Sequence, residues 1–337
     1  MTRSEIKTLF QRFADVRIGV IGDFAVDLYF DLQTETGERS LETHLDVFWG
    51  SHPRASLGAA GNVVQNLVAL GISQIQVLGC IGNDLFGREM QYLFNSLGVN
   101  TQHLHVVDYD WDTCVYAKPN QAGQEANRID FGTGNTLSDA LFANLLIGLE
   151  QALRDLDVLI INQQFPNPLL PENRLNNLNE LIARFPAVQV VADMRDVGRH
   201  VRGATLKVNT AELGHFLGIP VPTEPDLDWC VEQANAFREC SDTPLLITRG
   251  HAGIFYLDEY ETQTVEGLSL QGELDTVGAG DTVVATWSAC LGAGATSVQA
   301  LEIANLAAAV TIQKLAQTGT ASLSEILDLH HTYVAHD

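Results

Sequence analysis

Hydrophobic positions along the chain follow two spacings that alternate from one end to the other. Short, nearly continuous apolar runs are typical of buried strands, and the clearest lie at 17–21, 75–80, 158–162, 188–193, 204–208 and 245–248. Segments with an apolar residue every three or four positions are typical of amphipathic helices, and they lie at 62–70, 85–97, 139–154, 172–184, 226–238 and 283–291. Strands that alternate with helices predict an α/β fold with a mostly parallel sheet and right-handed crossovers.

Residues 1–14 are predicted to form an amphipathic helix docked on the body of the protein, because Ile6, Leu9, Phe10 and Phe13 fall on one helical face. The segment lacks the continuous apolar core of a signal peptide. No apolar run elsewhere approaches the roughly 20 residues that cross a bilayer. We therefore expect a protein with no membrane partner.

Two segments interrupt the alternation of strands and helices. Residues 31–57 and 105–130 mix polar, apolar and aromatic residues in the period-two pattern of short strands. We predict that they form a small β-rich lid inserted in a single α/β domain over 1–337. Phe48 and Trp49 in the lid suit either the cover of a pocket or a homodimer interface, and the sequence leaves both open.

Composition narrows the classes of function. With 337 residues, 46% of them hydrophobic, the chain can bury the core of one large domain. Its 19 Lys and Arg against 42 Asp and Glu give a net charge of −23. We expect no nucleic-acid partner, because this field repels a polyanion, and an anionic substrate needs a local basic pocket. Five cysteines without C-x-x-C spacing argue against a zinc site or a secreted disulfide framework and favour the cytoplasm.

Residues 275–282, with the sequence Asp-Thr-Val-Gly-Ala-Gly-Asp-Thr, are the strongest candidate for chemistry. Gly278, Ala279 and Gly280 let the backbone approach a ligand closely, and free amides at the start of the following helix stabilise a transferring phosphoryl group. Asp281 stands at the same helix start and is suited to accept a hydroxyl proton. Alternatively, Asp281 only caps the helix and the glycines only form a tight turn.

Three further segments accompany this one. Residues 58–62 open a predicted helix, 82–87 join a strand to the next helix, and 209–212 (Asn-Thr-Ala-Glu) start another helix. In this order, together with 275–282, they resemble the signatures of the ribokinase-like (PfkB) carbohydrate kinases. Within that family the chain most resembles the D-glycero-heptose 7-phosphate kinases, through 22–23, 58–62, 128–130 and 276–282. The resemblance implies a three-layer ribokinase-like fold.

The resemblance also implies an activity, the ATP-dependent transfer of a phosphoryl group to a hydroxyl of a sugar or sugar phosphate. Asp281 would activate the hydroxyl, and Gly278, Ala279 and Gly280 would form the anion hole. Asn209 and Glu212 would organise Mg²⁺ and the ATP phosphates, mostly through water. The remaining implied nucleotide contacts are Lys207, Thr248, Gly250 and Asn305. A potassium ion near the anion hole and dimerisation through the lid are implied as well.

The acceptor sugar would lie near the first strand, at the edge of the sheet where α/β ligand sites gather. Carboxylates and amides satisfy polyols by paired hydrogen bonds, and the implied residues are Asp23, Asp27, Gly58 and Asn62. Arg128 is the candidate for a phosphate already present on the substrate. A salt bridge between Arg128 and Asp130 is an equally weighted alternative.

For other candidate site residues, a structural or solvent-exposed role without a ligand is an alternative. Glu212 could be only a first-turn helix carboxylate, and Lys207 a solvated charge at a strand end. Arg249 and His251 are more often solvated loop residues than ligands.

Three departures from the family pattern leave the sugar undetermined. Ala59 stands where the family has the second glycine of a pair, and Asp193-Met194-Arg195 replaces the Asp-Pro-Lys of heptose kinases. Arg195 keeps the charge of that lysine but not its geometry. Residues 162–166 replace the acidic, tyrosine-bearing segment of those enzymes.

Two rival functions remain. A Rossmann dehydrogenase shares the alternation of strands and helices, but 17–27 lacks the G-x-G-x-x-G motif after its strand. A family member that binds sugar or nucleotide without turnover would have no need of the base, so Asp281 argues against it.

Overall fold

The computed structural model describes residues 1–315 and 318–334. The six predicted apolar runs become β1 (Arg17–Gly22), β4 (Gln74–Gly82), β9 (Val158–Gln163), β10 (Gln189–Met194), β11 (Thr205–Asn209) and β12 (Leu245–Thr248) of the larger sheet. This sheet also contains β5 (Asn100–Val107), β13 (Ile254–Leu257) and β14 (Thr262–Val265). Within the described residues their order is β14-β13-β12-β11-β10-β9-β1-β4-β5. All pairs from β5 to β12 are parallel, whereas β13 and β14 are antiparallel. The prediction of a mostly parallel sheet is confirmed.

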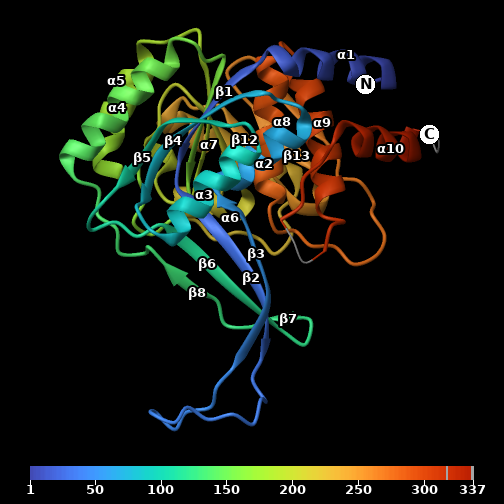
Figure 1. Ribbon diagram of the computed structural model, residues 1–337. Coiled ribbons are helices and arrows are strands. Elements are labelled where there is room, and N and C mark those ends of the chain that lie inside the picture. Colours follow the sequence, from blue (N-terminus) through green and yellow to red (C-terminus); the bar gives the residue numbers. More distant parts are fainter. Residues whose placement is uncertain (316–317, 335–337) are drawn as a thin grey trace.

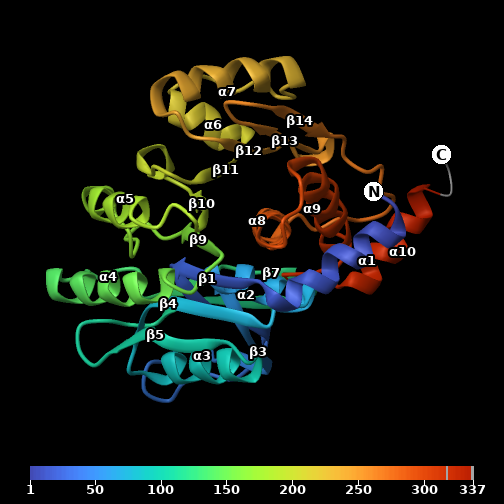
Figure 2. The same ribbon diagram turned by 90° about the horizontal axis from the view of Figure 1, so that it is seen from above.

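Helices cover both faces of this sheet (Figure 2). One face carries α4 (Asp139–Leu153), α5 (Leu175–Ala183), α6 (Thr210–Leu217) and α7 (Leu227–Ser241). The other carries α1 (Arg3–Arg12), α2 (Ala60–Leu70), α3 (Leu85–Ser96), α8 (Ala279–Gly292), α9 (Ser297–Thr311) and α10 (Leu323–Val334). Short 3₁₀ turns occur at Phe13–Asp15, Glu172–Arg174, Gly198–His200 and Gly250–Ala252.

The alternation of side chains along β9 shows why the sheet needs two helical layers. Leu159 and Ile161 enter the core beneath α4 and α5, whereas Val158 and Ile160 enter the core beneath α8. A strand buried on both faces is hydrophobic at nearly every position. This is the reason that the strand runs in the sequence are continuous rather than alternating.

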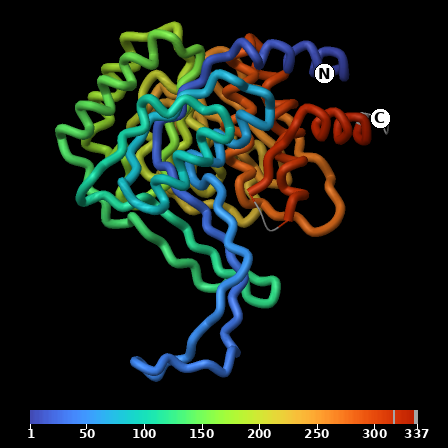
Figure 3. The backbone as a smooth tube through the Cα atoms, in the orientation of Figure 1, coloured from blue at the N-terminus to red at the C-terminus, as the bar shows by residue number. Residues whose placement is uncertain are grey.

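A smaller sheet projects from the body (Figure 1). It consists of β2 (Phe24–Gln33), β3 (Trp49–Ala59), β6 (Cys114–Gln121), β7 (Gln124–Glu125) and β8 (Ile129–Phe131). The order is β3-β2-β6-β7, and β8 pairs with β6. Between β2 and β3, residues 34–48 form an arm that extends away from the body (Figure 3). Arg39 and Asp46 form an isolated β-bridge within this arm.

The boundaries of this smaller sheet differ from the predicted 31–57 and 105–130. The sheet begins at Phe24, because Asp23 alone separates β1 from β2, and β3 continues to Ala59. Residues 105–107 belong to β5 of the larger sheet. Strands of both sheets show apolar runs, so the sequence pattern could not assign each run to its sheet.

The smaller sheet has one apolar and one polar face. Phe24, Val26 and Leu57 are buried in the main core, where the ring of Phe24 meets the edge of Phe94 on α3 at 5.4 Å. Asp27 follows Val26 on β2 and points to the opposite face, because successive strand residues face opposite sides. The apolar face thereby fixes the sheet on the body and leaves the polar face for a ligand.

The strand order reverses between β1 and β9. From β1 the chain proceeds through β4 and β5 on one side, and from β9 through β10, β11 and β12 on the other. In open α/β sheets, ligands bind at the carboxyl ends of the strands beside such a reversal. No helix within 1–315 and 318–334 is long and apolar enough to cross a membrane.

Candidate active site

Asp281 lies in the first turn of α8, directly after the glycine-rich segment. Gly278 adopts the left-handed conformation with φ 80° that favours glycine. Asn62, from the start of α2, donates a hydrogen bond from Nδ2 to Oδ2 of Asp281 at 3.3 Å. Burial, reinforced by the nearby charge of Asp193, raises the pKa of Asp281 to about 7. A base with this pKa is matched to proton transfer near neutral pH.

A buried contact sets the position of α8 against α2. Thr282 Oγ1 and Asn66 Oδ1 lie 2.9 Å apart, and both side chains are almost completely buried. Because a buried hydroxyl that loses its partner is costly, this contact fixes the first turn of α8. Asp281, next to Thr282 on α8, and Asn62, one turn before Asn66 on α2, are thereby held together.

Lys207 places a cation beside the anion hole. Its Nζ lies 3.2 Å from both carboxylate oxygens of Asp193 on the neighbouring strand, and only 6% of the residue is exposed. A Cβ atom built on Gly280 would lie 2.8 Å from this Nζ, so glycine is required for the close approach. Burial alone would lower the pKa of Lys207, but the neighbouring carboxylates outweigh it and raise the pKa. The alternative of a solvated strand-end charge is therefore wrong.

A cavity of about 490 Å³ opens between the ends of β11 and β12 and the helices α8 and α9. Five of the predicted nucleotide contacts line it together with Ala279 and Gly280, namely Lys207, Asn209, Thr248, Gly250 and Asn305. Leu268, Ala308 and Ile312 give it apolar walls suited to a flat ring. Glu212 is not among the lining residues. The cavity thus joins an apolar end to the helix start that bears Asp281.

Asn209 and Glu212 form a reciprocal capping box at the start of α6. The Asn209 N–H donates to Glu212 Oε2, and the Glu212 N–H donates to Asn209 Oδ1, each at 2.8 Å. Glu212 therefore acts as a first-turn helix carboxylate, which is the alternative considered for it. Across 1–315 and 318–334, no three Asp, Glu, His or Cys residues come together as a metal site. The side-chain oxygens of Asn209 and Glu212 are of the donor type that magnesium takes, directly or through its water shell.

Asp27 lies on the polar face of the smaller sheet and is only 2% exposed. Its Oδ2 pairs with Lys118 Nζ at 3.1 Å, whereas its buried Oδ1 has no hydrogen-bond partner. A Cβ atom on Gly58 would lie 2.8 Å from this Oδ1. Burial raises the pKa of Asp27. An unpartnered buried acceptor is costly to leave unsatisfied, so Asp27 suits an incoming hydroxyl.

Asp23 has a structural role that the sequence did not reveal. Its Oδ2 accepts N–H groups of Gln164 and Phe165, and its Oδ1 accepts the Leu169 N–H, at 2.7–3.0 Å. Burial raises its pKa to about 6. Both oxygens hold the loop after β9 through its backbone N–H groups, and the contact of Asp23 to sugar hydroxyls stays a prediction.

Arg128 adopts the alternative role weighed for it. It donates from Nε and Nη2 to both oxygens of Asp130 at 2.6 and 2.7 Å, and its guanidinium lies 4.2 Å from the ring centre of Tyr116. Arg128 also lines a second cavity, of about 730 Å³, together with Arg54 and Lys118. Sequence reasoning missed these two cations. No local signal marks Arg54 and Lys118, because only the pairing of β2 with β3 and with β6 brings them together.

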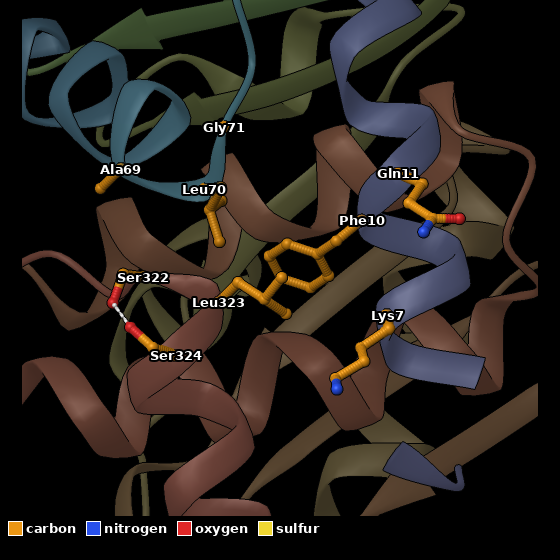
Figure 4. Close-up of a pocket in the computed structure, with 9 residues that line it drawn as sticks. All are labelled: Lys7, Phe10, Gln11, Ala69, Leu70, Gly71, Ser322, Leu323 and Ser324. Carbon is orange, nitrogen blue, oxygen red and sulfur yellow. Dashed lines mark hydrogen bonds between the residues drawn. The ribbon is translucent and has the colours of Figure 1, made fainter. Parts of the chain in front are cut away.

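A separate surface depression of about 560 Å³ lies away from this site (Figure 4). Phe10 of α1 and Leu323 of α10 form its floor beside Leu70. Leu70 ends α2, whereas Asn62 belongs to its first turn, so this depression is at the opposite end of that helix.

The family model of the pfkB family carbohydrate kinases matches residues 51–323. The chain belongs to the pfkB family of carbohydrate kinases. The matched region contains the helix start at 58–62, the capping box at 209–212 and Asp281, so most of the site described above lies in the family domain.

Relatives and solved structures agree with this family. The chain is 31% identical over 331 residues to the bifunctional protein HldE of Geotalea uraniireducens, covering 97% of this chain and 65% of that protein. It is 26% identical over 319 residues to HldE of Hydrogenovibrio crunogenus, covering 93% and 62%. The chain therefore spans slightly less than two thirds of the length of these relatives.

The ribokinase-like fold is shown by two solved structures. Arabidopsis thaliana ribokinase complexed with ribose and ATP aligns with TM-score 0.71 and 17% identity, covering 93% of this chain and 98% of that one. Phosphofructokinase-2 from Escherichia coli in complex with potassium aligns with TM-score 0.74 and 16% identity, covering 95% and 99%. Both layers of helices and the larger sheet are therefore those of the ribokinase-like fold.

One departure from the pfkB pattern has a visible structural consequence. Ala59, at the N-cap of α2, has φ 52° and ψ −127°. This region is readily adopted by glycine and strained for residues with a Cβ atom. The glycine expected from the family would relieve that strain.

Proposed function

We propose that this protein transfers the γ-phosphoryl group of ATP to a hydroxyl of a sugar or sugar phosphate. The observation that carries the proposal is the position of Asp281. Leu274 and Thr276, a few residues before the start of α8, line both the 490 Å³ cavity and the 730 Å³ cavity, and Ala279 and Gly280 of α8 line the first. This supports a reaction at the helix start that bears Asp281, between a nucleotide in the first cavity and an acceptor in the second.

The residues divide the reaction between them. Asp281 takes the proton of the attacking hydroxyl as the oxygen bonds to phosphorus, and ADP leaves into the 490 Å³ cavity. Asp27 and Asn62 hold neighbouring hydroxyls of the acceptor. The amides at 278–280 and the ammonium of Lys207 stabilise negative charge on the transferring group. Together they orient both substrates and exclude water from the reacting atoms.

Mg²⁺ and K⁺ belong to the same proposal. A bound magnesium ion would offset charge on the ATP phosphates, and Asn209 and Glu212 would hold it through its water shell. Support comes from the carboxylate of Glu212, because its negative charge is one of those that raise the pKa of Lys207. A potassium ion near 278–280 is proposed by analogy with the structural neighbour described in complex with potassium.

A heptose 7-phosphate-like acceptor is the finer proposal. The resemblance to the D-glycero-heptose 7-phosphate kinases supports it, while residues 162–166 and Arg195 depart from them. We also propose that the protein acts in the cytoplasm, in keeping with its unpaired cysteines Cys80, Cys114, Cys230, Cys240 and Cys290.

The Asp281→Asn variant tests the proposal. We expect kcat to fall by at least about 10²-fold, because proton transfer by a positioned base contributes 10²–10⁴ in rate. ATP affinity, measured by isothermal titration calorimetry, stays near that of the wild type. The assay measures ADP release over a panel of sugars and sugar phosphates. Turnover of the variant at the wild-type rate would remove Asp281 from its role.

A further inference from the structure

A row of three side chains crosses the polar face of the smaller sheet. Tyr29 on β2 is paired in register with Arg54 on β3 and with Lys118 on β6. Residues paired in register point to the same face, and all three line the 730 Å³ cavity. The guanidinium of Arg54 lies 6.0 Å from the ring centre of Tyr29, and the ammonium of Lys118 lies 4.9 Å from it. We call this the Arg54–Tyr29–Lys118 row.

The charges of the cavity single out Arg54. Two of its cations have carboxylate partners, since Arg128 is paired with Asp130 and Lys118 with Asp27. Within the described part of the chain, Arg54 makes no ion pair, although Glu125, Glu273 and Asp275 also line the cavity. In a protein of net charge −23, a cavity with an unneutralised guanidinium is a local attraction for an anion.

Lys118 links this row to the acceptor site. Its Nζ lies 3.1 Å from Asp27 Oδ2 and donates to the Tyr29 hydroxyl at 3.2 Å. One ammonium therefore touches both the proposed hydroxyl-binding residue and the row. Lysine has three donors on a flexible stem, so Lys118 can keep its contact to Asp27 while a third hydrogen bond is made to a ligand.

The spacing of the row matches the length of a sugar. Tyr29 follows Asp27 by two positions on β2, and a strand rises by about 3.3 Å per residue. The row therefore lies about 7 Å farther from the body than the hydroxyl-binding position. An anionic group attached to the far end of a sugar of five to seven carbons reaches this distance while its other end stays beside Asp281.

We infer that the Arg54–Tyr29–Lys118 row is an anion subsite that selects an acceptor with a charged group at the end remote from the hydroxyl to be phosphorylated. The inference rests on the proposed kinase function and names the substrate class for it. Arg54 binds the anion through its planar pair of donors, and Lys118 adds a hydrogen bond. A phosphate ester and a carboxylate share the required chemistry. Arg54, rather than the internally paired Arg128, is the main specificity residue.

The test compares binding of matched ligands to the full chain by isothermal titration calorimetry. The panel contains sugar phosphates of five to seven carbons, the corresponding sugar acids and the neutral parent sugars. We expect the wild type to bind at least one anionic member about 10- to 100-fold more tightly than its parent, the range for a hydrogen-bonded charge pair. Comparison of the sugar phosphates with the sugar acids shows whether the row prefers a phosphate or a carboxylate. Arg54→Gln should lower this preference at least about tenfold.

Arg39→Gln is the matched control, because it removes the same charge from the arm of the same sheet. Arg39 pairs with Asp46 and does not line the cavity, so its variant should keep the wild-type preference. Arg54 is exposed, and thermal melts establish that both variants fold.

Two outcomes would overturn the inference. The first is a wild type that binds no anionic member more tightly than its parent. The second is an Arg54→Gln variant whose preference equals that of the wild type. ADP release measured alongside tests the kinase function separately, because an Arg54-dependent binding preference without ADP release leaves the subsite standing and removes the proposed reaction.

Discussion

At the scale of single residues, burial decides what each carboxylate can do. Asp281 and Asp23 both have raised pKa values, about 7 and about 6, and burial is the main cause for each. They differ in their partners. Asp23 accepts three backbone N–H groups, whereas Asp281 accepts one side-chain amide. Asp281 therefore keeps more lone pairs for a substrate proton than Asp23 does.

The pKa of Asp281 predicts the pH dependence of the reaction. The unprotonated carboxylate is the base, so kcat/KM should rise with pH and level off above about 7. Below that value we expect a fall of about tenfold per pH unit. The measurement is a pH series of kcat/KM at saturating ATP. A rate independent of pH between about 5.5 and 8 would contradict the assignment.

The raised pKa of Asp281 also predicts that folding stability falls over the pH range in which the reaction rate rises. A carboxyl group whose pKa is higher in the folded state binds its proton more tightly there than in the unfolded chain. The stability contributed by protonated Asp281 is therefore fully present below its ordinary pKa of 3.8 and is lost as the pH rises through about 7. Ionising the base for catalysis thus costs folding free energy, which is common at active sites.

At the scale of secondary-structure elements, the start of α2 combines function with strain. This helix supplies Asn62 to the site, and the chain enters it through Ala59 at φ 52°. A non-glycine residue in such a region costs of order 1–3 kcal/mol. The turn keeps this conformation because Ala59 is paired with Phe24 across the smaller sheet.

Replacing Ala59 by glycine should relieve this strain. We expect the free energy of unfolding to rise by about 1 kcal/mol, the strain energy less the extra entropy that glycine gives the unfolded chain. Chemical denaturation measures the change. Ala60→Gly is the control, because Ala60 is the first residue of α2, and glycine there should lower stability by about 0.5–1 kcal/mol. A lower stability of Ala59→Gly would show that the turn is unstrained.

At the scale of the whole molecule, the smaller sheet packs on the body through its apolar face, and on its other face Tyr116 meets Phe165 of the loop after β9. Its arm at 34–48 extends beyond the body (Figure 3), and large apolar side chains on and beside it are exposed, namely Leu41, Leu45, Phe48 and Trp49. Several large apolar side chains exposed on one segment suit an interaction site. We therefore keep the prediction of a homodimer through this sheet.

Sedimentation velocity of the Phe48→Ser, Leu45→Ser double variant tests the homodimer. We expect the wild type to sediment as a dimer and the variant to dissociate at least about tenfold more readily, because each large apolar side chain contributes roughly 1.5–3 kcal/mol when buried. Tyr260→Ser, which removes an exposed aromatic from the body instead, should leave the dimer intact. A monomeric wild type at micromolar concentration would refute the prediction.

The sequence by itself determined the elements and the class of chemistry. Continuous apolar runs and helical spacing predicted most strands of the larger sheet and most helices, because burial on two faces or on one leaves a local pattern. The segment at 275–282 predicted an anion hole with a base, and its resemblance to the family signature favoured this over a helix cap with a tight turn. These signals are local, so no tertiary information was needed to read them.

Tertiary structure alone decided which polar residues face a ligand. Asp23 and Asp27 look alike in the sequence. In the fold, Asp23 accepts hydrogen bonds from the backbone of the loop after β9, whereas one oxygen of Asp27 has no hydrogen-bond partner. Arg54, Tyr29 and Lys118 lie on strands far apart in the chain, and only the register of the smaller sheet brings them into one row. Pairing of side chains depends on distances between segments, and these distances are fixed by packing rather than by local sequence.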